Sequence, residues 1–539
     1  MRRALFSVFA GFALIVGSTS ADAVDRMTPR TLSIRKAGAP PSGPHAGRGA
    51  VGRTAVPLPD RQQGGTRKEG HMRLRIGPIM LVAAVLTLLA AGLPASADHE
   101  TRPHTQNVHA KGHSPHPATF LGEPDGVRHV NSDIAFWGNT AFNGNYDGFR
   151  VIDIADPDNP VEISHPSCNG DQGDIVVWEN ILVRAWNSKK TTARLCDGQT
   201  VPAGFEGVHI FDVSDQSDPA LVGSVVLPCG SHTLTTAGVS NGSLIVYSNN
   251  SSSAGCVDGT RPNDDPVGDF MDVIAVPVDN PAGASLIHRE PLAGPTTDVR
   301  TGCHDAGVIL GGVNKAVCAS ADTINVWDIG ANATPGGSPE DPALLFTIFE
   351  PGIGVAGTNG RWHSTVFTWD GAVIVAGWEP GGGAEPECEA TDPASDKSMF
   401  FYDATTGAKL GTWVLPRPQS AAENCTIHNY NLVPLRDGRD VVVSGNYQAG
   451  TWVTDITDPA NPVTVGWSDP PPLPPVTPPG GGQQVNELGG AWSSYWYNNF
   501  IYESEITKGL HLFRLSGSAT GGAIRLPHLN PQTQDFSLP

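Results

Sequence analysis

The sequence predicts an all-β fold, a seven-bladed β-propeller of four-stranded antiparallel blades. The chain has 63 Gly and 46 Pro among 539 residues, and only 16% of its residues are charged. Short apolar runs alternate with these turn residues, and long helical patterns are rare. A strand–turn–strand unit also recurs at a nearly regular interval, which is typical of an array of stacked supersecondary units.

The clearest copy of this unit is TWVTDITDPANPVTVGW, Thr451–Trp467. Apolar and polar residues alternate, stop at Asp-Pro-Ala-Asn-Pro and then alternate again. Asp458 is able to close an Asx-turn, and Pro459 fixes the backbone angle of the next turn position. We expect two further strands before each unit, as in HSTVFTWDGAVIVAGW, where Asp370-Gly371 forms a hairpin turn.

The unit occurs seven times, and the copies align on one anchor position. The anchor residues are Asp153, Asp212, Ala275, Asp328, Asp403, Asp455 and Arg514. Five of them are Asp in the middle of a predicted strand, so we assign them a structural hydrogen-bonding role. A catalytic ring of these residues is disfavoured because two copies lack the carboxylate. Seven four-stranded units lie within the usual range of four to eight blades.

The last copy lacks a fourth strand after Leu515. Upstream of the first copy, ATFLGEPD (118–125) resembles the outer strands of other copies. We predict that this N-terminal strand completes the last blade and closes the ring, which removes both sheet edges. The alternative closing strand is GGAIRLPHL (521–529), near the C-terminus. The propeller is thus expected over 118–515, with 98–117 disordered and 516–539 a C-terminal tail.

Two segments near the start have the charged, apolar and small-residue parts of secretory signal peptides, residues 1–23 and 72–97. The codons for KEGH before Met72 can contain a ribosome-binding sequence, so we hypothesise that Met72 is the true start. Residues 1–71 would then be a non-native leader; the alternatives are a real, disordered long leader and a precursor that is processed twice. Each reading gives a secreted or cell-surface protein with no membrane span in the mature chain.

The charge of the chain is strongly asymmetric. Residues 1–97 hold 13 Lys or Arg and 4 Asp or Glu, which leaves 21 basic and 50 acidic residues, a net charge of −29, after Ala97. Such an acidic protein is repelled by nucleic acid and by anionic lipid surfaces. We expect a monomer whose partner is an unidentified extracellular ligand, polymer or protein.

All eight cysteines follow the second signal-like segment, and an even count in an exported chain indicates disulfides. Strand starts and the ends of neighbouring strands lie together in an antiparallel blade, which predicts four pairs. They are Cys168–Cys196, Cys229–Cys256, Cys303–Cys318 and Cys388–Cys425.

Three copies carry a resemblance to a known repeat family: FRVIDIADPDNPVEI, VHIFDVSDQSDPALVG and TWVTDITDPANPVTVG look like LVIVD repeats. The other four copies are degenerate. The resemblance implies a propeller in the extracytoplasmic space, and it implies no single activity.

Long loops are expected on one face of the propeller, at Asn187–Gly207, Asn249–Asp269, Trp378–Lys397 and Ser468–Gly490. Loops of this length in a compact array are usually functional or disordered. The first functional hypothesis is therefore a secreted module that binds a ligand or a protein through this long-loop face.

Four histidines provide the second hypothesis. Each lies at the start of the inner strand of one of blades three to six, and they are His232, His304, His363 and His428. Inner-strand starts face the central funnel of a propeller, and neutral imidazole binds copper, iron or zinc. The alternative function is therefore a mononuclear metal-dependent oxidoreductase with an axial histidine cluster. The architectural alternative is that each His serves its own blade, because repeats propagate structural residues. No catalytic base or nucleophile is identified, and Asp305 is a further candidate ligand or acceptor.

Overall fold

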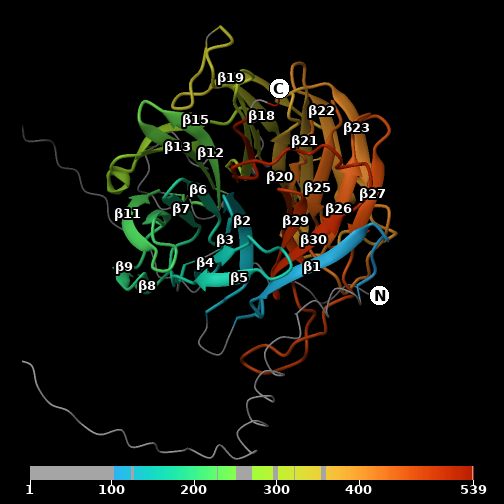
Figure 1. Cartoon of the computed structure of the whole chain (residues 1–539), viewed down its shortest axis with the longest axis horizontal. Helices are drawn as coiled ribbons and strands as arrows, with labels where there is room; N and C mark the ends of the chain where they lie inside the picture. Colours follow the sequence, from blue (N-terminus) through green and yellow to red (C-terminus); the bar gives the residue numbers. More distant parts are fainter. Residues whose placement is uncertain are drawn as a thin grey trace, which may run out of the picture. The chain divides into compact units, whose positions relative to one another are not determined.

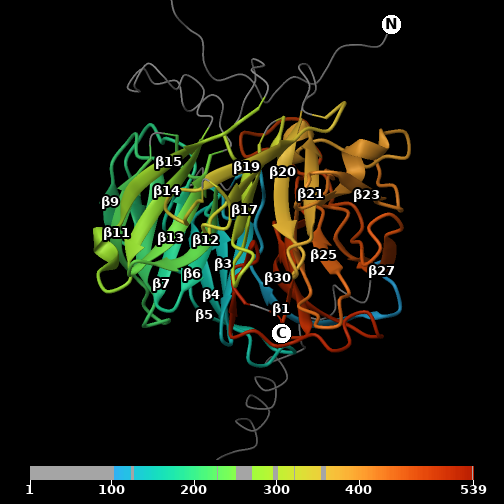
Figure 2. The ribbon, with the colours of Figure 1, turned by 90° about the horizontal axis from the view of Figure 1, so that it is seen from above.

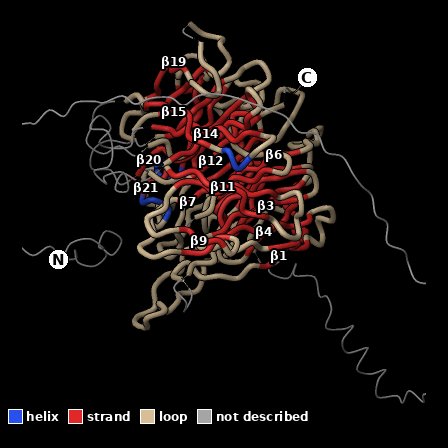
Figure 3. The backbone as a smooth tube through the Cα atoms, turned by 90° about the vertical axis from the view of Figure 1, so that its left-hand side faces the viewer, coloured by secondary structure: helices blue, strands red, loops and turns tan. Residues whose placement is uncertain are grey.

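The structure is a computed structural model. It describes residues 102–122, 127–170, 172–227, 229–250, 270–294, 302–320, 322–334, 336–353, 360–536 and 538. The leader and both signal-like segments lie outside these residues. Nearly all of the described regular structure is strand (Figure 3), and the helices described are three 3-10 turns at Pro281–Gly283 (η2), Gly381–Gly383 (η3) and Ala394–Lys397 (η4).

The protein is an all-β propeller, in which sheets follow one another around a common axis (Figure 1). The first and second sheets contain β2 Asn131–Trp137, β3 Thr140–Asn145, β4 Gly148–Asp153 and β5 Val161–Ser164, then β6 Ile175–Trp178, β7 Ile181–Trp186, β10 Gly207–Asp212 and β11 Ala220–Val226. The third contains β12 Thr233–Ser240, β13 Ser243–Asn249, β14 Phe270–Pro277 and β15 Ser285–Pro291. The fourth and fifth contain β16 Asp305–Ile309, β17 Lys315–Ala319, β18 Ile324–Asp328 and β19 Ala343–Ile348, then β20 Gly360–Phe367, β21 Val373–Pro380, β22 Ser398–Asp403 and β23 Lys409–Val414.

The remaining large sheet has eight strands. It contains β24 Asn429–Leu432, β25 Val441–Gly445, β26 Thr451–Asp455, β27 Val463–Ser468, β28 Ala491–Tyr497, β29 Phe500–Glu505, β30 Gly509–Leu515 and β1 Val108–Pro115. The prediction of seven separate blades is therefore wrong in detail, because five sheets have the size of one blade and the sixth is twice as large. The cause is one parallel residue pair, Asn429 with Ser493, which joins β24 to β28.

The ring is closed by an N-terminal strand, as predicted, but by a different one. Strand β1 pairs with β30 from Val108 opposite Leu515 to Pro115 opposite Gly509. The predicted closing segment, 118–125, has no strand over residues 118–122, and residues 123–126 lie outside the described part. Its apolar Phe120 packs into a loop cluster instead. The sequence VHAKGHSP of β1 lacks an apolar alternation, so the expected disorder of 98–117 is wrong for these eight residues.

The segment after Leu515 returns to the centre of the ring. Its two short strands are β31 (His528–Leu529), which pairs with β2, and β32 (Thr533–Gln534), which pairs with β16. Both partners are first strands of their sheets. In Figure 2 the C-terminus is marked on the lower side of the strands. These residues therefore form part of the fold and are not the free tail that the sequence predicted.

The core lies between neighbouring sheets, because alternate residues of each middle strand face opposite neighbours. In β10, Val208 and Ile210 pack toward β12 and β13 of the third sheet. Phe211, on the opposite side of β10, packs toward the first sheet with Phe149 of β4. This period of two is the pattern that the strand prediction rested on, and here it buries both faces of a sheet.

The five anchor aspartates have the structural role that we predicted. Each is the last residue of its strand rather than a mid-strand residue. Four of them accept the backbone N–H two residues further on at 2.9 Å, as Asp153 does from Ala155 and Asp455 does from Thr457. Asp328 makes the same contact with Gly330 at 3.1 Å. These Asx-turns end the strand and begin the connection to the outer strand.

Three of the four predicted disulfides are present: Cys168–Cys196, Cys303–Cys318 and Cys388–Cys425. The fourth prediction, Cys229–Cys256, involves a residue outside the described part. Within the described residues, no helix has the length and apolar character needed to cross a membrane.

Candidate functional site

The four predicted histidines lie at equivalent places in four consecutive sheets. His232, His304 and His428 each immediately precede the first strand of a sheet, β12, β16 and β24 respectively. His363 is the fourth residue of β20. All four side chains are buried. The sequence prediction that these residues share one end of the inner strands is therefore correct in position.

The four imidazoles form one continuous row, which we call the histidine arc. The ring centroids of His232 and His304 are 4.5 Å apart, those of His304 and His363 are 4.0 Å apart, and those of His363 and His428 are 4.2 Å apart. Residues 59 to 72 positions apart in sequence thus come into contact because each sheet begins beside the next.

Backbone contacts hold two of these rings in a defined orientation. Nδ1 of His304 donates to the carbonyl of His363 at 3.1 Å, and Nδ1 of His428 donates to the carbonyl of Trp492. A neutral imidazole that carries its proton on Nδ1 has its lone pair on Nε2, and a backbone carbonyl is a common partner for the Nδ1–H of a metal-binding histidine. Nδ1 of His363 is buried without a hydrogen-bond partner among the described residues.

A glutamate that the sequence prediction missed completes the arrangement. Glu379 is the seventh residue of β21 and is only 3% exposed. Its Oε1 is 3.7 Å from Nε2 of His363 and 3.9 Å from Nε2 of His428, and it accepts a hydrogen bond from the Tyr447 hydroxyl at 2.9 Å. Potential ligand atoms of His304, His363 and Glu379 all lie within 4.8 Å of one another. The register of the β20–β21 hairpin, which sets Glu379 opposite Arg361, places this carboxylate near the arc.

The electrostatics favour neutral imidazoles in the arc. Burial, followed by neighbouring positive charge, lowers the pKa of His304 and His363 well below the ordinary value. Burial also lowers the pKa of His428 to about 3. Arg361 Nε lies 3.5 Å from the other carboxylate oxygen of Glu379. Neutral nitrogen donors beside a carboxylate form the donor set that zinc, iron and copper accept.

Asp305 belongs to a different layer of the protein. Burial, then the charges of Asp174 and Asp133, raise its pKa well above the ordinary value. Asp174 and Asp133 are also buried, and burial raises the pKa of both carboxyl groups. We call these three residues the carboxyl layer. Asp305 is not among the residues whose potential ligand atoms converge, which are His304, His363 and Glu379.

Beyond His428 the row continues through aromatic rings toward the first sheet. The centroids of Trp492 and His428 are 5.1 Å apart, those of Tyr146 and Trp492 are 6.4 Å apart, and those of Phe120 and Tyr146 are 6.2 Å apart. Tyr146 lies in the β3–β4 turn, so this row extends from the histidine arc to the first sheet.

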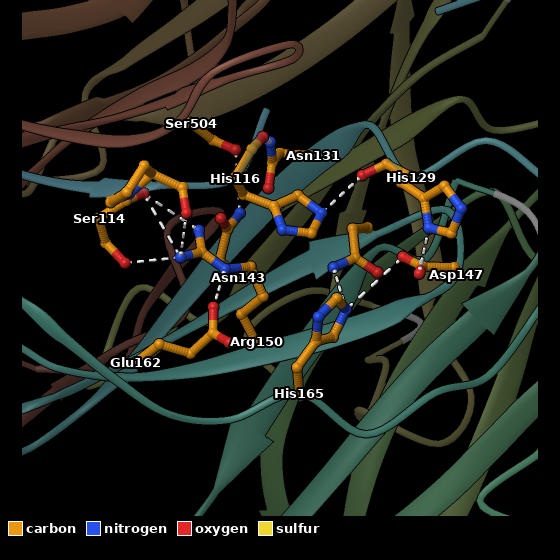
Figure 4. Close-up of polar contacts among 12 residues, drawn as sticks. Ser114, His116, His129, Asn131, Asn143, Asp147, Arg150, Glu162, His165 and Ser504 are labelled. Carbon is orange, nitrogen blue, oxygen red and sulfur yellow. Dashed lines mark hydrogen bonds and ion pairs between the residues drawn. The ribbon is translucent and has the colours of Figure 1, made fainter. Parts of the chain in front are cut away.

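The first sheet contributes a separate polar cluster at its own strand start (Figure 4). Nδ1 of His129 contacts Oδ2 of Asp147 at 2.5 Å, and Nε2 of His165 lies 3.6 Å from Oδ1 of Asp147. Burial raises the pKa of Asp147, but the hydrogen bonds and charges of His165 and His129 outweigh it and lower the pKa to about 2. Nε2 of His116, after β1, donates to the carbonyl of His129 at 2.9 Å. This cluster connects the closing strand, the approach to β2 and the β3–β4 turn.

Comparison with known proteins supports the repeat assignment. The family model described as LVIVD repeat matches residues 203–226 and 435–469, so the chain contains LVIVD repeats. These ranges correspond to the second and sixth copies, and the first copy is not matched. No curated protein matches the chain. Among solved structures, the computationally designed Ika8 protein matches with 15% identity and a TM-score of 0.36, over 75% of this chain and 99% of that one.

Proposed function

We propose that this protein is an extracytoplasmic binding module that acts through the loop-bearing face of its propeller, and that a transition-metal ion binds there in the histidine arc. The propeller fold and the LVIVD repeats support an interaction module. The three disulfides support an oxidising location outside the cytoplasm.

The observation that carries the metal proposal is the convergence of His304, His363 and Glu379 from two neighbouring sheets on one small volume. Backbone acceptors at Nδ1 of His304 and His428 leave Nε2 as the metal-binding atom of each ring. A cation there would also compensate the buried carboxylate of Glu379, which otherwise faces neutral imidazoles and Arg361. Copper, iron and zinc are the ions that this donor set suits.

The direct test is metal binding by tag-free, chelator-stripped protein. We expect about one equivalent of copper, zinc or ferrous iron per chain and a rise in Tm, because an ion that binds only the folded state stabilises it by mass action. Replacing both His304 and His363 by Ala should abolish binding, whereas His109→Ala, an exposed imidazole on β1, should not change it. Less than about a tenth of an equivalent, without a shift in Tm, would defeat the proposal.

A mononuclear metal-dependent oxidoreductase is the second candidate function. Two histidines and one carboxylate are the protein ligands of non-haem iron oxygenases, which keep other coordination positions open for substrate and oxygen. The test is the spectrum of nitric oxide bound to the ferrous protein. A paramagnetic iron–nitrosyl signal, lost in Glu379→Gln, would support an open iron site. If the protein binds one ferrous ion but gives no such signal, the oxidoreductase proposal is wrong and the binding module is the remaining proposal.

We also infer that the eight-stranded sheet is two blades, which gives the ring seven. Contacts between first strands follow the order β2, β6, β12, β16, β20, β24 and β28, and β28 contacts β2. Strands β24–β27 and strands β28–β30 with β1 each form an antiparallel ladder of four. An experimental structure in which either ladder lacks one of its four strands would contradict this inference.

A further inference from the structure

A cavity of about 350 Å³ lies between loops of the first and second sheets. Its described lining includes Arg128, Tyr146, Asn169, Gly170, Lys190 and Arg194. We call it the basic pocket. A volume of this size is typical of sites for small molecules, which combine a preformed wall with a few placed polar groups.

The charge of the basic pocket is opposite to that of the protein. Three of its lining residues are cationic and none of those described is acidic, although the chain after Ala97 carries a net charge of −29. Neither Arg128 nor Arg194 forms an ion pair with a described carboxylate. Salt screens the interaction of a ligand with charges more than about 8 Å away. The nearby guanidinium groups therefore decide which sign of ligand charge the pocket favours.

One wall of the pocket is held by a covalent bond and by close packing. The Cys168–Cys196 disulfide connects the segment that contains Asn169 to β8, Arg194–Cys196. The N–H of Asn169 donates to the carbonyl of Leu195 at 3.0 Å. A Cβ at Gly170 would lie 2.6 Å from the buried ring of Trp186, so only glycine fits this position without displacing that ring. The wall is thus formed before any ligand binds.

The part of the lining that contains Arg128 and Tyr146 adjoins the polar cluster drawn in Figure 4, because Arg128 precedes His129 and Tyr146 precedes Asp147 in the chain. The contact between His129 and Asp147 ties the residues beside Arg128 to the turn that contains Tyr146. The guanidinium carbon of Arg128 lies 4.6 Å from the ring centroid of Phe120, within the range of a cation–π contact. The backbone N–H of Phe120 donates to Glu487 at 2.7 Å. These contacts place Arg128 beside Phe120 and Tyr146 at the pocket.

We propose that the basic pocket binds a small organic oxyanion, a molecule that carries carboxylate or phosphate groups. Guanidinium groups form paired, charge-assisted hydrogen bonds with both kinds of oxyanion, and Arg128 and Arg194 both line the cavity from segments far apart in sequence. We therefore expect a ligand with two anionic groups to use both guanidinium groups. This site uses none of the residues of the histidine arc, so it is independent of the metal proposal.

Isothermal titration calorimetry on chelator-stripped protein tests the proposal, with citrate and inorganic phosphate as separate probes and glucose as the uncharged control. We expect one site for at least one anion, no heat from glucose and affinity that falls as salt is added. Citrate alone would identify a carboxylate ligand, and phosphate alone would identify a phosphate ligand. Absence of binding by both anions at millimolar concentration would overturn the proposal.

The double change Arg128→Gln with Arg194→Gln should weaken binding at least about tenfold, since it removes two charge-assisted contacts. The matched control is Arg514→Gln, which removes an exposed cation on β30 and should leave affinity unchanged. An equal loss in both variants would show only general attraction to positive charge and would overturn the site. The Tm of each variant verifies folding, and Glu379→Gln should retain anion binding whatever the outcome of the metal experiments.

Discussion

The two ends of the inner strands are both polar and buried, yet they are built differently. At their starts lies the histidine arc, where Nδ1 of His363 has no hydrogen-bond partner among the described residues. At their far ends lies the C-terminal segment. There the side-chain amide of Asn530 makes two hydrogen bonds with the backbone of Val177: its oxygen accepts from the N–H at 2.8 Å, and its nitrogen donates to the carbonyl at 2.9 Å. Asn530 at the far end therefore pairs the backbone polar groups of an inner strand, which is the usual role of a structural polar residue.

This difference separates an architectural polar group from a candidate ligand. Gln532 donates to Asp133 at 3.1 Å, and the hydroxyl of Thr533 donates to the carbonyl of Thr236 at 2.8 Å. Removing such a residue leaves a buried partner unsatisfied. In the histidine arc, His304 and His428 also contact backbone carbonyls. Nδ1 of His363 has no such partner among the described residues, so removal of His363 should matter most when an ion is bound.

The largest expected effect follows from removing the far-end segment. A chain that ends at Gly522 loses β31, β32 and the buried Leu526 and Leu529. We expect its free energy of unfolding to fall by at least about 5 kcal/mol, from several lost hydrogen bonds and uncovered apolar area. Urea denaturation measures the change. Ser518→Ala, in the exposed part of the same segment, is the control, and an unchanged midpoint in the truncated chain would show that the segment is dispensable.

A single change at the far end should have a smaller effect. Asn530→Ala leaves the N–H and carbonyl of Val177 unpaired, and we expect a loss of roughly 2–3 kcal/mol of stability. Asn461→Ala, at an exposed turn, should cost less than about 1 kcal/mol. Equal losses of stability in the two variants would show that the buried amide of Asn530 contributes no more than the exposed amide of Asn461.

The carboxyl layer between the two ends should respond to pH. Burial and the charge of Asp133 raise the pKa of Asp174 well above 3.8. The folded chain thus retains a proton that the unfolded chain loses, so stability is full below pH 3.8 and falls by up to about 1.4 kcal/mol for each pH unit above it. Asp174→Asn should be more stable than the unchanged protein at pH 7, and this gain should shrink toward zero near pH 4. A gain that urea denaturation finds constant from pH 4 to pH 8 would contradict this assignment.

The smallest effect is expected in the histidine arc without metal. His363→Gln in chelator-stripped protein should change the free energy of unfolding by no more than about 1 kcal/mol, because Nδ1 of His363 leaves no described partner unsatisfied. With saturating metal the same variant should lose the stabilisation that the ion gives. If the loss in stripped protein equals that of Asn530→Ala, the arc is architectural and the comparison between the two ends fails.

The repeat made most of the propeller predictable. A period-two pattern that ends at an Asp-containing turn fixes which residues begin each inner strand, and this placed His232, His304 and His428 correctly. The same reasoning paired three disulfides. Glu379 was missed because it lies at the end of a second strand, whereas the prediction considered only residues at the starts of the inner strands. Its position depends on the register of one hairpin.

The chain ends were the least predictable part. Strand β1 is recognisable only from its ladder with β30, since its sequence has neither apolar alternation nor β-branched residues apart from Val108. Strands β31 and β32 are two residues each, too short for any periodic signal. Tertiary pairing, rather than local propensity, decides the structure of all three.

The pairing of β1 with β30 has a consequence for synthesis. A ribosome makes β1 before every other strand of the ring, but its partner lies about 400 residues later, as the contact between His109 and Ser516 shows. The segment of β1 therefore remains unpaired until almost the whole chain has been synthesised. An unpaired segment rich in apolar residues would promote aggregation with other nascent chains. The polar sequence VHAKGHSP, which conceals this strand from pattern analysis, is suited to that interval because it remains hydrated until its partner arrives.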